Sequence, residues 1–145
     1  MHKLPLLTAF IIAACLLSYT IAPAATPIVL TPAEEAALAK EPPLAQADVD
    51  AFIAYGPALI KAFNLNDAQT AETVLNRTGW SKTRSSYVIS KISYGYAVAI
   101  QPRAAKTMLE SAGIPAVLMP SATELELIKQ NMPALDEIFG ALTSR

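Results

Sequence analysis

The chain has 145 residues and a nearly balanced charge, with 11 Lys and Arg against 12 Asp and Glu. Because no basic stripe is present, the sequence gives no indication of a nucleic-acid partner. Its length suffices for one domain with a single core and not for two.

Residues 1–25 have the pattern of a secretory signal peptide. A short positive region at residues 1–3 precedes an apolar run at residues 4–21, and small alanines follow it. We therefore expect cleavage after Ala24 or Ala25, which would leave residues 26–145 as one periplasmic or secreted domain.

Two other interpretations of the N-terminal segment stay open. Its apolar run is just long enough to serve as an uncleaved membrane anchor. Residues 12–15, Ile-Ala-Ala-Cys, have the form of a bacterial lipobox, in which Cys15 would carry the lipid. No further run is long enough to cross a membrane, so we expect no membrane span after cleavage of the signal.

Cleavage would remove the only histidine, His2, and the only cysteine, Cys15. The mature chain would then have no disulfide, no His or Cys ligand for zinc, no imidazole base and no thiol nucleophile. We therefore expect no metal site, no cofactor and no enzymatic activity. An enzyme built from this chain would depend on a carboxylate, Lys, Ser or Tyr.

Helix start and stop signals begin at Thr31. With Glu34 three residues later, Thr31 forms a capping box that opens a short helix, and Pro42 ends it. A second helix is predicted from Gln46 or Ala47 to Phe63, where apolar residues recur at steps of three and four. Pro57 is expected to kink or split this helix.

The third predicted helix covers residues 67–78, with Asn66 as its cap and Gly79 in the left-handed position after its end. Beyond the central segment, a helix over residues 103–112 is expected to point Met108 inward and to end at Gly113.

A second capping box at residues 121–124 opens the next helix, and Pro133 breaks or bends it. These repeated signals favour an all-α bundle of six or seven short helices.

Residues 81–101 form the predicted centre of this bundle. At 100° per residue this segment is apolar or aromatic around most of its circumference, which is typical of a helix surrounded by neighbours. Its Val, Ile and Tyr residues would also suit a strand. Such a strand would be unusually long and would have nothing else in the chain to pair with, so helix is the prediction.

Arg84 and Lys91 lie seven residues apart within the apolar sector of this helix, with Tyr87 and Tyr94 beside them. The arrangement suggests a partly buried cationic site for an anionic ligand or an acidic partner segment. Arginine would supply paired hydrogen bonds, and the phenols would supply donors and stacking surface.

The same two cations have structural interpretations. Arg84 and Lys91 could reach carboxylates such as Asp48 or Asp50 on the neighbouring helix and form internal ion pairs. Both long side chains could instead extend to a nearby surface.

Paired carboxylates occur at four places in the sequence. A glycosidase needs two carboxylates that face each other across a cleft. Each pair falls in the first turns of a predicted helix, where carboxylates stabilise the helix dipole. We therefore expect them to be solvated: Glu34 and Glu35, Asp48 and Asp50, Glu124 and Glu126, Asp136 and Glu137.

A loose pattern of apolar, charged and aromatic residues runs through the first half of the domain: Asp48, Phe52, Pro57, Leu59, Trp80, Arg84, Tyr87-Val88 and Lys91-Ile92. In this pattern the chain resembles small exported α-helical proteins of Gram-negative bacteria, known mainly as domains of unknown function. The resemblance implies export and an all-helical fold, and it implies no catalytic residues.

Two functions remain open from the sequence. The first is a non-enzymatic protein-binding or structural module of the cell envelope. The second is a periplasmic carrier of a small anionic or amphipathic ligand, held near Arg84 and Lys91 in a pocket between the central helix and the helix at residues 48–63.

Overall fold

The computed structural model describes residues 30–143, so the predicted signal segment lies outside the described residues. Within that range the chain forms seven α-helices and one short 3₁₀-helix and contains no strand, which confirms the all-α bundle. The helices are α2 (Pro32–Ala39), α3 (Gln46–Asn64), α4 (Ala68–Thr78), α5 (Lys82–Ile100), α6 (Pro102–Ser111), η1 (Ala116–Leu118), α7 (Ala122–Gln130) and α8 (Met132–Thr143).

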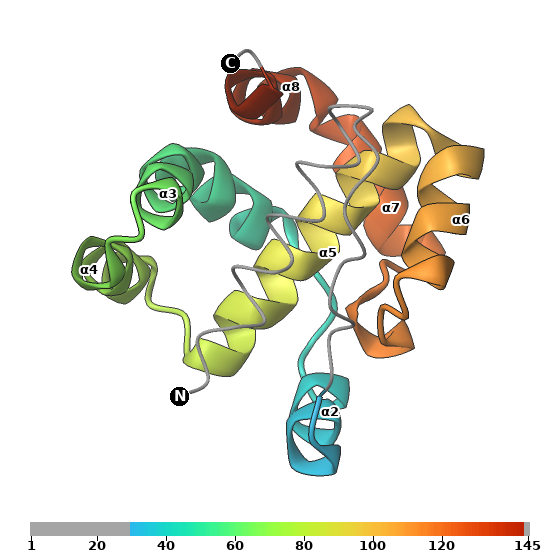
Figure 1. The fold of residues 1–145 in the computed structure, drawn as a ribbon, viewed down its shortest axis with the longest axis horizontal. Helices are drawn as coiled ribbons and strands as arrows, with labels where there is room; N and C mark the ends of the chain where they lie inside the picture. The colour runs from blue at the N-terminus through green and yellow to red at the C-terminus, as the bar shows by residue number, and fades with distance from the viewer. Residues whose placement is uncertain (1–29, 144–145) are drawn as a thin grey trace.

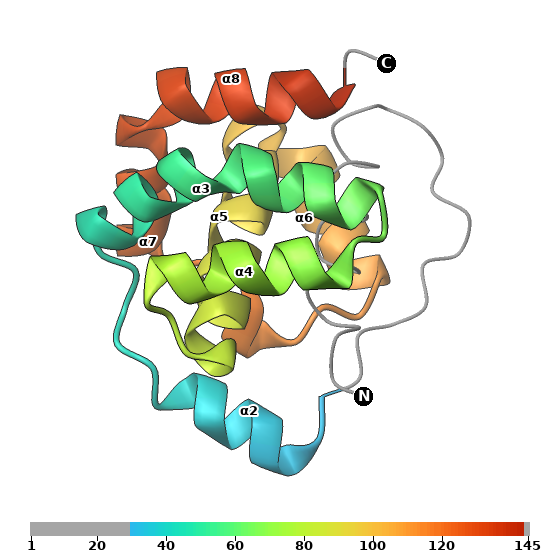
Figure 2. The same ribbon diagram turned by 90° about the vertical axis from the view of Figure 1, so that its left-hand side faces the viewer.

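The centre of the fold is α5, which crosses the middle of the molecule with α3 and α4 on one side and α6 and α7 on the other (Figure 1). Every residue from Tyr87 to Ala97 on α5 is buried. The prediction of a surrounded central helix is confirmed, and the strand alternative is wrong. Figure 2 shows α3 and α4 as an antiparallel pair in front of α5, with α8 above them and α2 below.

An aromatic stack joins three of these helices. The ring of Phe139 on α8 lies 4.4 Å from that of Tyr96 on α5 and 5.9 Å from that of Phe52 on α3, centroid to centroid. The Tyr96 hydroxyl also donates a hydrogen bond of 2.5 Å to Asp136. Around this stack the core contains mainly aliphatic side chains: Leu38, Leu44, Val49, Leu59, Val74, Val88, Ile89, Ile92, Leu109, Leu118, Ile128, Leu135 and Ile138.

Most helix ends follow their sequence signals. Both predicted capping boxes are present, at Thr31 with Glu34 and at Ser121 with Glu124. Gly79 ends α4 with a φ of 77°, the left-handed conformation that glycine adopts without steric cost. Gly113 does the same after α6, with a φ of 69°.

Three local predictions are wrong. Asp67, not Asn66, caps α4, because its carboxylate accepts the Thr70 N–H at 3.0 Å while Asn66 takes a left-handed φ of 54°. Pro57 does not split α3, which continues from Gln46 to Asn64 with Pro57 exposed, so the split is wrong and a kink stays a prediction. Met108 is 37% exposed, because the buried face of α6 consists of other residues, Ala105 and Leu109.

The close approach of α5 to α7 depends on Gly95. A Cβ atom built at this position would overlap the Cδ1 methyl of Ile128 and lie 3.4 Å from Pro120. Because Ile128 is fully buried, its side chain has little room to move away. The glycine therefore sets the distance between the central helix and α7.

Candidate functional site

The buried carboxylate of Glu124, at the start of α7, is the centre of the polar network in this bundle. It is 3% exposed. Oε1 accepts hydrogen bonds from Lys91 Nζ at 2.9 Å and from the Ser121 N–H at 3.0 Å. Oε2 accepts from the Tyr87 hydroxyl and from the Leu44 N–H, both at 2.9 Å. Four donors thus occupy the acceptor sites of one carboxylate.

The Lys91 ammonium is also bound by groups inside the protein. Its ammonium donates to the carbonyl of Met119 at 2.6 Å in addition to its ion pair with Glu124. The side chains of the pair are 8% and 3% exposed. A buried ion pair offsets its desolvation cost only when further hydrogen bonds support both partners. Here Glu124 accepts from four donors, and Lys91 has two acceptors for its three N–H groups, with the Tyr87 ring 4.9 Å from Nζ.

The hydrogen bonds decide the charge of Glu124. Burial by itself raises the pKa of the carboxyl, but the Ser121 and Leu44 N–H groups, the Lys91 ammonium and the Tyr87 hydroxyl outweigh it and lower the pKa from 4.5 to about 2. Glu124 is therefore ionised in the folded protein at neutral pH. Burial, followed by the hydrogen bond to Glu124, raises the pKa of Tyr87, which stays a neutral donor.

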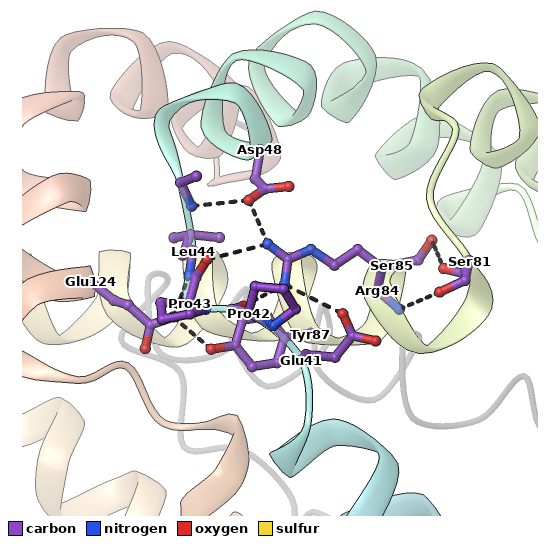
Figure 3. A network of polar contacts seen from close by, with 11 residues as sticks. Glu41, Pro42, Pro43, Leu44, Asp48, Ser81, Arg84, Ser85, Tyr87 and Glu124 are labelled. Carbon is purple, nitrogen blue, oxygen red and sulfur yellow. Dashed lines mark hydrogen bonds and ion pairs between the residues drawn. The ribbon is translucent and has the colours of Figure 1, made fainter.

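Arg84 holds the segment that connects α2 to α3 (Figure 3). Its Nη2 lies 2.6 Å from the Asp48 carboxylate and 3.4 Å from the Pro43 carbonyl. Its Nη1 donates to the Pro42 carbonyl at 2.5 Å and lies 3.4 Å from the Glu41 carboxylate. The Arg84 side chain is 14% exposed. Each of these hydrogen bonds and ion pairs joins the connector or the first turn of α3 to α5.

Tyr87 lies between Arg84 and Lys91 in the sequence, and its ring contacts both cations. The Arg84 Cζ is 5.0 Å and the Lys91 Nζ 4.9 Å from its centroid. Both distances fall within the range of cation–π attraction. The ring thus supports the same two cations that the carboxylates pair with.

Three of the four residues predicted as a ligand site, Arg84, Tyr87 and Lys91, therefore come together in one network. Tyr94 is not part of it: its hydroxyl is buried, has no hydrogen-bond partner among the described residues, and has a pKa raised by burial. Whether any of the four binds a ligand remains a prediction.

The ion-pair interpretation describes this network better. Arg84 pairs with Asp48, as that interpretation expected, whereas Asp50 accepts a hydrogen bond from Gln46 instead. Lys91 pairs with Glu124. The expectation of solvated carboxylates is wrong for Asp48, whose side chain is 13% exposed, and for Glu124, whose side chain is 3% exposed. The capping-box position of Glu124 was visible in the sequence, but the partners that bury it come from segments 33 and 80 residues away.

We expect acid to remove the contribution of Glu124 to stability. Its pKa is lower in the folded protein than its ordinary 4.5, so this contribution is complete above about pH 4.5 and is lost as the pH falls toward about 2. The shift corresponds to about 3 kcal/mol. Denaturant unfolding from pH 6 down to the lowest pH that retains the fold measures it. The Glu124→Gln variant is the control: its deficit relative to wild type should shrink with acid, and a constant deficit contradicts the assignment.

Tyr87 and Tyr94, which are both buried, should respond differently to loss of the hydroxyl. Tyr94→Phe removes a buried group without a partner and should leave the free energy of unfolding unchanged or raise it by about 1 kcal/mol. Tyr87→Phe removes a donor to a carboxylate and should lower it by about 2 kcal/mol. Urea unfolding of both variants tests this. A clear loss for Tyr94→Phe would show that its hydroxyl has a partner.

A pocket of about 340 Å³ lies outside this network, where the start of α3 meets α7. We name it the α3–α7 hollow; it is shallow and open, and its lining consists of Leu44, Ala45, Gln46, Thr123, Glu126, Leu127 and Gln130. None of the four predicted ligand residues is in this lining. Among residues 30–143 no group of three or more Asp, Glu, His or Cys side chains is placed to hold a metal ion.

Within the same described range, no helix combines the length and the apolar character needed to span a bilayer. No family model matches the chain, and no match is found among curated proteins or solved structures. The resemblance to exported helical proteins stays a prediction from the sequence pattern.

Proposed function

We propose that this chain is an exported, non-enzymatic helical module that binds a protein partner, and that the α3–α7 hollow is its binding face. The observation that carries this proposal is the internal pairing of the central charges. Arg84 and Lys91 are each bound to carboxylates and carbonyls of the same chain. Groups held in this way stabilise the bundle and are not free to perform chemistry on a substrate.

Unlike the network around Arg84 and Lys91, the α3–α7 hollow has polar side chains that can bind a partner. Thr123, Glu126 and Gln130 are exposed along one face of α7, and none of them has a side-chain hydrogen bond or ion pair among the contacts described. Leu44 and Leu127 give the same surface an apolar component. A polar rim beside partly buried apolar groups is the usual anatomy of a protein-binding surface.

The carrier function receives less support from this geometry. A small anion at Arg84 or Lys91 would have to displace Asp48 or Glu124, and would leave a carboxylate buried without its cation. Export itself rests on the signal-like pattern of residues 1–25.

Site-specific photocrosslinking in the source cell tests the proposal. We would place the photoreactive residue p-benzoylphenylalanine at Gln130, in the hollow, and as a control at the exposed Glu72 of α4, which lies on the opposite side of α5 (Figure 1). The expected result is a specific covalent adduct with another envelope protein from position 130 and none from position 72. The same adducts at both positions, or none at position 130, would contradict the proposed face.

A further inference from the structure

The α3–α7 hollow carries negative charge and no positive charge. Glu126 is the only charged residue in its lining and takes part in no ion pair among the described residues. Asp50 adds a second carboxylate beside the lining residue Gln46, whose Nε2 donates to it at 2.8 Å. Lys129, three residues after Glu126, is exposed but does not line the hollow. The local charge therefore favours a cationic group.

The N-terminus of α3 does not reverse this preference. Its positive end would attract an anion if its N–H groups were free. However, the Leu44 N–H donates to Glu124 and the Ala45 N–H donates to Asp48, each at 2.9 Å. These two N–H groups directly precede the helix, and the Asp48 carboxylate lies in its first turn, so negative charge already offsets the positive end of α3.

The shape of the hollow suits a long side chain with an apolar stem. Leu44, 6% exposed, and the partly buried Leu127 provide aliphatic contact for the methylene groups of lysine or arginine. Glu126 lines the hollow together with Leu127 and can meet the charged end. A volume of about 340 Å³ is at the lower end of ligand sites, which suits one side chain and its adjoining backbone.

One wall of the hollow is fixed in advance. Gln46 and Asn131 exchange two amide hydrogen bonds, of 3.0 and 3.1 Å, and Asn131 also donates to the Leu127 carbonyl at 2.8 Å. The lining also includes Gln130 and Thr123, whose exposed side chains have no hydrogen bond among the described residues and can bind the backbone of a bound segment. A preorganised wall lowers the entropy cost of binding.

Resting on the proposed function, we propose that the partner inserts a lysine or arginine side chain of an extended segment into the α3–α7 hollow. The stem lies along Leu44 and Leu127, the cation pairs with Glu126, and the free amide of Gln130 binds the partner backbone.

An NMR titration of the ¹⁵N-labelled protein tests the chemistry of the hollow. The probes are N-acetyl-lysine N-methylamide and its uncharged analogue with norleucine. We expect saturable amide shifts confined to residues 44–46 and 123–131, with the lysine compound binding about two- to fivefold more tightly, as one exposed charge pair allows. Glu126→Gln should abolish this preference, whereas the matched Glu72→Gln on α4 should leave it unchanged. Equal binding of both compounds, shifts elsewhere, or a preference that survives Glu126→Gln would overturn the proposal.

The photocrosslink at position 130 separates this inference from the proposed function. Sequencing of the crosslinked peptide should find Lys or Arg at or next to the attached residue. An adduct to a segment that lacks both residues would overturn the inference and leave protein binding intact. The absence of any adduct would overturn both.

Discussion

Replacing Glu124 by Gln is expected to lower the free energy of unfolding by about 3 kcal/mol, because the buried Lys91 ammonium loses its counter-charge. Gln keeps the volume and one carbonyl acceptor, but its NH2 group faces two of the four donors, so the loss reports on charge and hydrogen bonding and not on packing. Lys91→Met should cost a similar amount, since it leaves the Glu124 carboxylate buried without its cation. Guanidinium chloride unfolding followed by circular dichroism measures both variants.

The double variant Lys91→Met with Glu124→Gln decides whether the two residues act as a pair. Because neither charge then remains, its loss should be clearly smaller than the sum of the two single losses. Glu126→Gln is the matched control, since Glu126 is exposed and unpaired, and it should change stability by no more than about 0.5 kcal/mol. Additive losses for Lys91 and Glu124 would contradict the buried pair.

Gly95→Ala should lower the free energy of unfolding by about 2 kcal/mol, since the added methyl overlaps Ile128 and must push α7 away from α5. Thermal and urea unfolding measure the loss. The matched control is Gly140→Ala on α8, where a Cβ would meet no atom of the described side chains within 4 Å. That substitution should raise stability by about 0.5–1 kcal/mol through the helix preference of alanine.

A second substitution identifies the clashing atom. Ile128→Val removes the Cδ1 methyl that the new Cβ would overlap. By itself it should cost about 1 kcal/mol, but combined with Gly95→Ala it should cost less than the two separate losses together. If the loss of the double variant equals the sum of the two single losses, the Cδ1 methyl of Ile128 is not the atom that the added Cβ meets.

The features that were predictable from the sequence are local ones. The capping boxes at residues 31–34 and 121–124 and the glycine ends at Gly79 and Gly113 need only neighbouring residues, and the structure contains all four. The central helix was predictable because its apolar surface is wider than one contact face requires. Local chemistry and periodicity thus suffice for the helices of this bundle.

The partners of the central charges were only partly predictable. Asp48 was an available partner for Arg84 because it begins a predicted neighbouring helix. Glu124 was not identified, because its pattern is that of an exposed capping residue and its burial depends on the packing of α5, α7 and the segment before α3. The sequence also contains no signal for the hollow, whose lining combines residues about 80 positions apart along the chain.

The central claim is that Arg84 and Lys91, the two positive charges inside the network around α5, are bound by the protein itself. Competitive acetylation of native protein with acetic anhydride, followed by mass spectrometry, tests this claim most directly through Lys91, which is 6% exposed. Lys82, Lys106 and Lys129 are exposed and should react readily, whereas Lys91 should stay unmodified until the protein is denatured. Acetylation of Lys91 in the native protein at the rate of these surface lysines would contradict the account.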